Sequence, residues 1–340
     1  MPNSVRETAV CHATRLLFLP LRWQAHGAAP YATVLFLCNL LLYAIRFAEI
    51  IDNKRTGIVS VGPVAGVARA AGACMTRIEE RGMMANEALD HELLASVDMT
   101  DVENLFASIN RQGFGVLHNV VPDVVLAPMR EYITAELARR GGQYFGMRGH
   151  DWIEESPLNA VFSARGFRTV LEGLYHRAMH EEPLSKRILP VLRVLAGTHG
   201  LRHANLFHYD SYVVTALVPV LIPNRPDEPH GDLVMYPNMR NVRGPVMLNI
   251  LEKAIVESPP ACRFWRSPAV QRRLGAKPVP LEPGNIYFFW GMRSLHANEA
   301  CLPTSIRSTA LFHYGDPHEN SILKRLSQAR ARANLRRLAK

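Results

Sequence analysis

The sequence has few cysteines, and none of them has the spacing of a paired cysteine site. The 340 residues include only 5 cysteines, and no C-x-x-C pair occurs. Zinc sites and thiol redox sites built on such pairs are therefore excluded. A chain of this length buries its core without disulfide bonds, so scattered cysteines are typical of a reducing compartment. We expect a cytoplasmic protein.

Acidic residues are missing from the C-terminal end of the chain. No Asp or Glu follows Glu319, whereas seven Lys or Arg residues do. These seven carry most of the formal net charge of +9, and the rest of the chain is nearly neutral. We therefore expect no nucleic-acid partner. Residues 321–340 are predicted to form a basic helix, which either caps the fold in solvent or is attracted to anionic lipid.

The sequence also lacks a hydrophobic run long enough to cross a membrane, although a shorter run is present. Residues 28–45 carry no charge, and the strongly apolar part is Tyr31–Ile45. A helix over that part is about 22 Å long, whereas a bilayer core is about 30 Å thick. Arg15 and Trp23 precede the run, as is typical of a membrane interface. Residues 1–56 are predicted either to attach to the cytoplasmic surface of a membrane or to form a buried helix.

Composition divides the rest of the chain into segments of different character. Residues 57–100 begin small and glycine-rich and then become charged, which predicts a linker followed by a helix. Residues 101–320 are predicted to form one domain, with a helix over Asp101–Arg111 that Thr100 caps. The second half of this domain has short strand-like segments separated by Pro and Gly, which indicates a sandwich or barrel. A helical insert is expected at 239–281.

Two histidines and one carboxylate occur in an order that suits metal binding. His208 and Asp210 are two residues apart, so on a strand their side chains point to the same face. His296 follows His208 by 88 residues and brings a second imidazole from another strand. Two histidines and a carboxylate bind Fe(II) on one face of its octahedron in non-heme oxygenases. We predict that these three residues hold the metal and form the catalytic centre.

A basic residue follows at a position that suits the carboxylate of a co-substrate. Arg307 lies 11 residues after His296, in a strand-like segment. A planar guanidinium binds a carboxylate through two parallel hydrogen bonds, so it suits the distal carboxylate of a keto acid that chelates the metal. Thr309 shares the strand face of Arg307 and can donate a third hydrogen bond. We predict a co-substrate site formed by Arg307 and Thr309.

These motifs resemble the Fe(II)/2-oxoglutarate-dependent dioxygenase superfamily, and most of all its phytanoyl-CoA hydroxylase-like group. The similarity covers about residues 101–316 and includes the segments HGDL at 230–233 and PGN at 283–285. The resemblance implies an α+β fold with a double-stranded β-helix core of jelly-roll or cupin-like type, N-terminal helices and a helical insert. It also implies Fe²⁺ as the metal, 2-oxoglutarate as the co-substrate and O₂ as the oxidant.

The resemblance further implies an enzyme that couples decarboxylation of 2-oxoglutarate to hydroxylation of a C–H bond. Asp210 argues against halogenation, because the halogenases of this superfamily lack that carboxylate. The insert at 239–281 favours a covered pocket, so we expect a small-molecule or lipid-like substrate. Two other interpretations stay open, namely a non-catalytic jelly-roll or cupin-like binding protein and a protein or peptide hydroxylase. His313 is interpreted as a residue that only lines the barrel.

Overall fold

The computed structural model describes residues 93–224, 228–242 and 244–321, and all of them belong to one compact unit. The predictions for residues 1–56, for most of 57–100 and for the tail beyond Ser321 fall outside the described residues. Within the described ranges, every helix is too short or too polar to span a bilayer. The boundaries expected for the four segments of the chain stay predictions.

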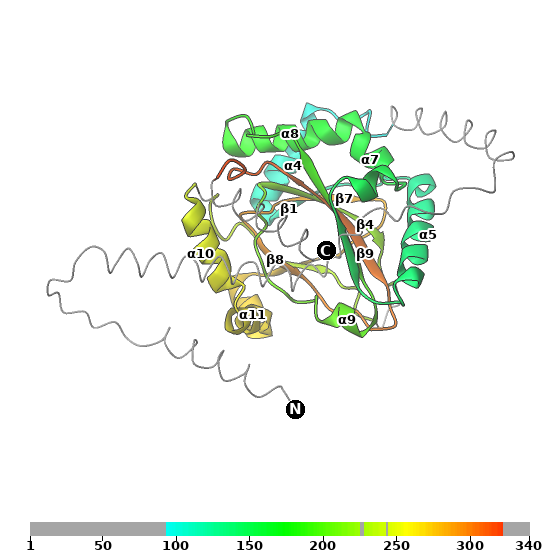
Figure 1. Cartoon of the computed structure of the whole chain (residues 1–340). Helices are drawn as coiled ribbons and strands as arrows, with labels where there is room; N and C mark the ends of the chain where they lie inside the picture. The colour runs from blue at the N-terminus through cyan, green and yellow to red at the C-terminus, as the bar shows by residue number, and fades with distance from the viewer. Residues whose placement is uncertain (1–92, 225–227, 243, 322–340) are drawn as a thin grey trace, which may run out of the picture. The chain divides into compact units, whose positions relative to one another are not determined.

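Two antiparallel sheets form the centre of the fold (Figure 1). The smaller sheet has three strands, in the order β6 (Lys277–Val279), β5 (Leu233–Tyr236) and β8 (Leu295–Asn298). An isolated bridge between His208 and His296 adds a further segment beside β8. The larger sheet has six strands, which lie in the order β1 (Phe114–Leu117), β7 (Ile286–Trp290), β4 (Val214–Leu221), β9 (Arg307–Tyr314), β3 (Ile188–Leu195) and β2 (Phe145–Arg148).

The path of the chain between the two sheets identifies the fold. From β3 onward the chain passes from the larger sheet to the His208 segment of the smaller sheet, and then back to β4. It continues through β5 and β6 in the smaller sheet, β7 in the larger, β8 in the smaller and β9 in the larger. This alternation is the winding of a double-stranded β-helix, a relative of the jelly roll. The prediction of an α+β fold with this core is confirmed.

Three long helices pack on the larger sheet. They are α4 (Met99–Gln112), α5 (Asp123–Arg139) and α8 (Arg165–Met179), and each contacts at least one strand of that sheet. The expected first helix is present, but Thr100 does not cap it. Asp98 is the N-cap instead, because its carboxylate accepts hydrogen bonds from the backbone N–H groups of Thr100 and Asp101. Three short helices complete this part of the fold, namely α6 (Asp151–Glu154), α7 (Asn159–Ser163) and α9 (Gly197–Leu201).

The main hydrophobic core lies between these helices and the larger sheet. Phe167 of α8 packs edge-on against Phe312 of β9, with ring centroids 5.2 Å apart. Strand β3 alternates buried and half-buried side chains, as expected when one face of a strand covers the core. The apolar residues of α5 that recur at helical spacing are all buried, namely Leu126, Met129, Ile133 and Leu137. The core thus holds the larger sheet in place. Three of its strands, β4, β7 and β9, contribute residues to or near the candidate site.

The segment between β5 and β6 is helical, as expected for residues 239–281. It contains α10 (Val246–Val256), α11 (Pro259–Arg266) and α12 (Pro268–Leu274). Ser258 caps α11 by accepting a hydrogen bond from the Ala261 N–H, and a proline stands in the first turn of α11 and of α12. In Figure 1, α10 and α11 lie on one side of the sheets and α5 lies on the other.

Candidate metal and co-substrate site

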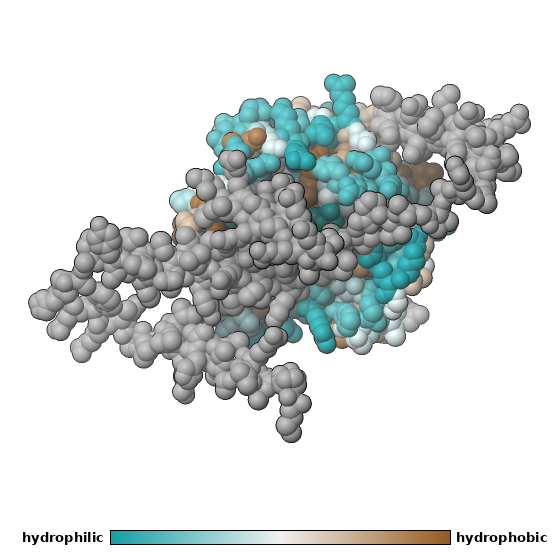
Figure 2. All heavy atoms as spheres, viewed as in Figure 1, coloured by the Kyte–Doolittle hydropathy of each residue, from teal (hydrophilic) through white to brown (hydrophobic). Residues whose placement is uncertain are grey.

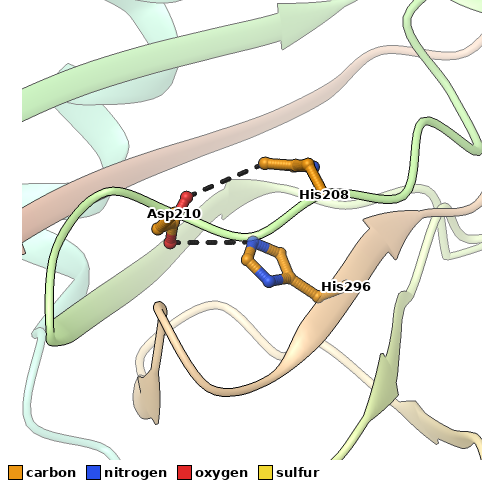
Figure 3. Close-up of side chains that lie close together, drawn as sticks. All are labelled: His208, Asp210 and His296. Atoms are coloured by element: carbon orange, nitrogen blue, oxygen red, sulfur yellow. Dashed lines mark ion pairs between the residues drawn. The ribbon is translucent and has the colours of Figure 1, made fainter. Parts of the chain in front are cut away.

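His208 and His296 lie directly opposite each other in the smaller sheet. The N–H of each donates to the carbonyl of the other, with N···O distances of 3.0 and 3.1 Å. Their ring centroids are 4.5 Å apart. Figure 3 shows both imidazoles pointing toward the carboxylate of Asp210. Residues 88 positions apart in the sequence are therefore held side by side by the backbone itself.

Asp210 reaches the same point from a loop and not from a strand. The sequence predicts that His208 and Asp210 share one strand face, but only His208 takes part in a bridge. The Asp210 N–H instead donates to the carbonyl of Gly291, at 2.9 Å. A side chain at position 291 would collide with this carboxylate, because an added Cβ would lie 2.7 Å from Oδ2 of Asp210. Glycine at 291 therefore leaves room for the carboxylate.

Backbone carbonyls orient the two imidazoles. Nδ1 of His208 lies 2.9 Å from the Leu206 carbonyl oxygen, and Nδ1 of His296 lies 2.9 Å from the Ser294 carbonyl oxygen. A carbonyl can only accept, so the proton of each neutral ring is on Nδ1. Nε2 is left with its lone pair directed at the site. Fixing the tautomer in this way is how proteins prepare histidine for metal binding.

The three side chains fit a single metal ion. Nε2 of each histidine lies 3.7 Å from an oxygen of Asp210. One ligand atom from each residue lies within 4.8 Å of the other two, and no other group of this kind occurs among the described residues. Asp210 and His296 are buried, whereas the His208 side chain is 23% exposed. Two neutral imidazoles and one carboxylate on one side of an ion are the facial arrangement of non-heme iron sites.

The surroundings of Asp210 keep its carboxylate ionised. Burial opposes this, but His313, His296, His208 and the hydroxyl of Thr215 together hold the pKa of Asp210 well below its usual range. Thr215 on β4 donates to Oδ2 of Asp210 at 2.6 Å. An ionised carboxylate is the form that binds a metal.

His313 is a residue near the site that sequence reasoning did not connect with it. Nδ1 of His313 lies 3.7 Å from Oδ2 of Asp210 and 3.1 Å from Oγ1 of Thr215. Burial lowers the pKa of His313 to about 4, although Asp210 opposes this, so the ring is neutral at neutral pH. Thr215 and His313 are direct partners in the pairing of β4 with β9. Such a register is invisible in one sequence, where His313 lies 98 residues after Thr215.

Arg307 is a buried cation at the start of β9. It is 3% exposed, its Nε donates to the Gly231 carbonyl at 2.7 Å, and its Nη1 donates to Oγ1 of Thr309 at 3.3 Å. Burial lowers the pKa of Arg307 to about 10, so it stays charged at neutral pH. Among the described residues, no carboxylate lies within ion-pair distance of it. Asp232 attracts this charge from beyond ion-pair distance, but burial still outweighs that attraction, so the position suits an anionic ligand.

Gly231 allows Arg307 to pack as it does. Its φ of +72° lies in the left-handed region, and an added Cβ would lie 2.4 Å from Sγ of Cys301 and 2.7 Å from Cδ of Arg307. Gly231 belongs to the HGDL segment, which ends where β5 begins. Met235 of that strand pairs with His296. The smaller sheet therefore links the surroundings of Arg307 to the metal-binding side chains.

The helical insert contacts the residues on either side of Asp210. The guanidinium of Arg240 lies over the ring of Tyr209, 3.9 Å from its centroid. Nζ of Lys253 on α10 donates to Oγ of Ser211 at 3.0 Å. The insert thus stabilises the loop that carries Asp210, a function that its sequence position alone does not indicate.

No protein-family model and no curated protein matches the sequence. In fold, the chain is similar to solved Fe/2-oxoglutarate oxygenases. The epimerase SnoN, solved with Fe³⁺, alpha ketoglutarate and nogalamycin RO, has a TM-score of 0.43 and 16% identity, covering 64% of this chain and 85% of SnoN. A prolyl 4-hydroxylase from Phytophthora capsici has a TM-score of 0.43 and 13% identity, covering 67% and 68%. A prolyl hydroxylase from Trichoplax adhaerens has a TM-score of 0.40 and 13% identity, covering 71% and 96%.

Proposed function

We propose that this chain is an Fe(II)- and 2-oxoglutarate-dependent dioxygenase of the phytanoyl-CoA hydroxylase-like group. Its reaction is the hydroxylation of a C–H bond in a small or lipid-like molecule. The observation that carries this proposal is the combination of a facial metal cluster with Arg307, a buried cation that has no carboxylate partner among the described residues. The carboxylate of a bound 2-oxoglutarate would offset the cost of burying that charge.

The protein's own residues bind and orient the reactants. His208, Asp210 and His296 hold the metal, and bound iron supplies the redox chemistry that the side chains cannot. Arg307 and Thr309 hold the distal carboxylate of 2-oxoglutarate, which fixes the end of the molecule that faces the metal ligands. Placing reactants in this way lowers the entropic cost of the reaction.

Apolar side chains keep the inner side of the site dry. The ring of Phe289 packs edge-on against His296, with centroids 4.9 Å apart. Met235, the partner of His296 in the pairing of β5 with β8, is fully buried in the same hydrophobic cluster as Phe289. Excluding water strengthens electrostatic interactions within the site and protects reactive species from side reactions. The more exposed His208 marks the side from which a substrate can approach.

The experiment that tests the proposal is a succinate-release assay with Fe(II) added under anaerobic conditions before O₂. We expect succinate to form from 2-oxoglutarate only with iron, and one or more members of a panel of metabolites and lipids to increase the rate. Binding of iron and 2-oxoglutarate without any succinate would contradict the proposal and favour the cupin-like binding protein. Stimulation by peptides alone would contradict the proposed substrate class and favour the protein or peptide hydroxylase.

A further inference from the structure

Helix α10 exposes its apolar face and turns its polar face toward the protein. Asn249 is buried and accepts a hydrogen bond from Nη2 of Arg240, at 2.8 Å. Glu252 forms an ion pair with Nη1 of Arg240 at 2.6 Å, and Lys253 donates to Ser211. A surface helix of a soluble protein normally has the opposite orientation, with its apolar face toward the core.

The outward face of α10 consists of four large apolar side chains. They occur at spacings of one, four and eight residues, which place them on one side of a helix with 3.6 residues per turn. Ile255 is 60% exposed, and the other three are more than 40% exposed. The four side chains are Met247, Leu248, Leu251 and Ile255.

Exposed apolar residues are concentrated in this part of the fold. Of the 12 large hydrophobic side chains that are exposed among the described residues, seven lie between Met239 and Leu274. Figure 2 shows that the surface over α8 is mostly hydrophilic, whereas hydrophobic atoms are visible where the upper end of α10 lies. A concentrated apolar surface on a soluble protein marks an interaction site.

The charge of the same segment indicates the chemistry of the partner. Residues 239–281 contain eight Lys or Arg and only two Glu, although the chain without its basic tail is nearly neutral. Arg263 and Arg266 are exposed on α11 and flank Phe264, which is 51% exposed. Arg272 and Arg273 are exposed on α12. Apolar side chains next to exposed arginines are typical of helices that lie in the interface of an anionic membrane.

We infer that α10 and α11 form a docking surface for an anionic phospholipid membrane. The apolar side chains of α10 and Phe264 enter the interface, and the arginines of α11 bind lipid phosphate groups. Because Lys253 and Arg240 connect α10 to the loop of Asp210, docking places the candidate site next to the membrane. The inference goes beyond the proposed function, since membrane binding requires neither iron nor 2-oxoglutarate.

The test is sedimentation of the full chain with vesicles of phosphatidylcholine alone or of phosphatidylcholine mixed equally with phosphatidylglycerol. We expect tighter binding to the mixed vesicles and weaker binding at high salt, because salt screens the arginines. The variant R263Q/R266Q should bind mixed vesicles at least tenfold more weakly, since each arginine near an anionic surface contributes roughly a fivefold factor, or about 1 kcal/mol. R111Q/R187Q, which removes two exposed arginines elsewhere, should bind like the wild type.

A second pair of variants tests the apolar face. L251Q/I255Q should bind both kinds of vesicle at least tenfold more weakly, because burial of several CH₂ groups is lost. V124Q/L184Q removes two exposed apolar side chains elsewhere and should leave binding unchanged. If L251Q/I255Q and V124Q/L184Q bind equally, the inference is wrong. Conversion of a wild-type dimer into a monomer by L251Q/I255Q, with vesicle binding unchanged, would show an interface between two copies and would also overturn it.

A measurement on the wild type keeps the test independent of how well the variants fold. Hydrogen exchange of the full chain, with and without mixed vesicles, should show slower exchange in residues 246–256 and 259–266 when vesicles are present. Exchange in α5 should not change. Vesicle binding without protection of α10 and α11 would place the contact elsewhere in the chain, for example in the basic tail, and would overturn the inference.

Discussion

Thr215 donates its hydroxyl to Oδ2 of Asp210 at 2.6 Å, while its oxygen lies 3.1 Å from Nδ1 of His313. A hydroxyl has one proton to donate, so the Thr215 oxygen accepts from Nδ1–H of His313. The three residues therefore form a chain of hydrogen bonds that ends on one of the candidate metal ligands. Hydrogen bonds of this kind orient a ligand and tune its basicity.

Replacing Thr215 by valine removes the hydroxyl and keeps the shape of the side chain. We expect the affinity for Fe(II) to fall about 10- to 100-fold, because Asp210 loses a hydrogen bond that orients it. T215S keeps the hydroxyl and should restore most of the affinity. The measurement is anaerobic equilibrium dialysis of Fe(II). T134V is a matched control, since the Thr134 hydroxyl bonds only to a carbonyl within α5. Wild-type affinity in T215V would show that the hydrogen bond has no function in metal binding.

Arg307 is predicted to hold 2-oxoglutarate and not the metal. Loss of a hydrogen bond to a charged group costs roughly 1.5–3 kcal/mol, so R307L should raise the KM for 2-oxoglutarate at least tenfold. Fe(II) affinity should be unchanged. R307K keeps the charge but not the two parallel bonds, and its KM should lie between those of R307L and the wild type. R111L, on the exposed face of α4, is the control. An unchanged KM in R307L would place the carboxylate site elsewhere.

Alanine variants at Gly231 and Gly275 distinguish the effect of packing around Arg307 from the effect of backbone strain. Both have φ near +70°, so alanine is strained at either position. An added Cβ would collide with Cys301 and Arg307 at position 231 but meets no atom within 4 Å at position 275. We therefore expect G231A, and not G275A, to raise the KM for 2-oxoglutarate. Thermal unfolding of both variants measures the shared effect of strain. Equal KM values in the two variants would contradict this function of Gly231.

The fold and the candidate ligands follow from local patterns in the sequence. The helical spacing of Leu126, Met129, Ile133 and Leu137 predicts the buried face of α5, because neighbours on one side of a helix face the same core. His208, Asp210 and His296 follow from their residue types and order. The three side chains lie together as predicted even though Asp210 lies in a loop and not on a strand.

Three other features depend on contacts between distant residues or on backbone geometry, which a single sequence does not reveal. The contact of His313 with Thr215 arises from the register of β4 with β9, which is set by packing across the whole sheet. The apolar pattern of α10 predicts a helix with one apolar face, but the direction of that face depends on Arg240 and Ser211. Asp98 and Thr100 both suit the N-cap of α4, and only the backbone geometry distinguishes them.

The most direct test of the candidate site is a titration of 2-oxoglutarate into the anaerobic protein, with and without Fe(II), for the wild type and H296A. H118A, which removes an exposed histidine that does not belong to the cluster, is the control. We predict that Fe(II) strengthens 2-oxoglutarate binding in the wild type and in H118A, and that H296A loses this effect. Iron-dependent strengthening of 2-oxoglutarate binding that persists in H296A would contradict the assignment of His208, Asp210 and His296 as the metal ligands.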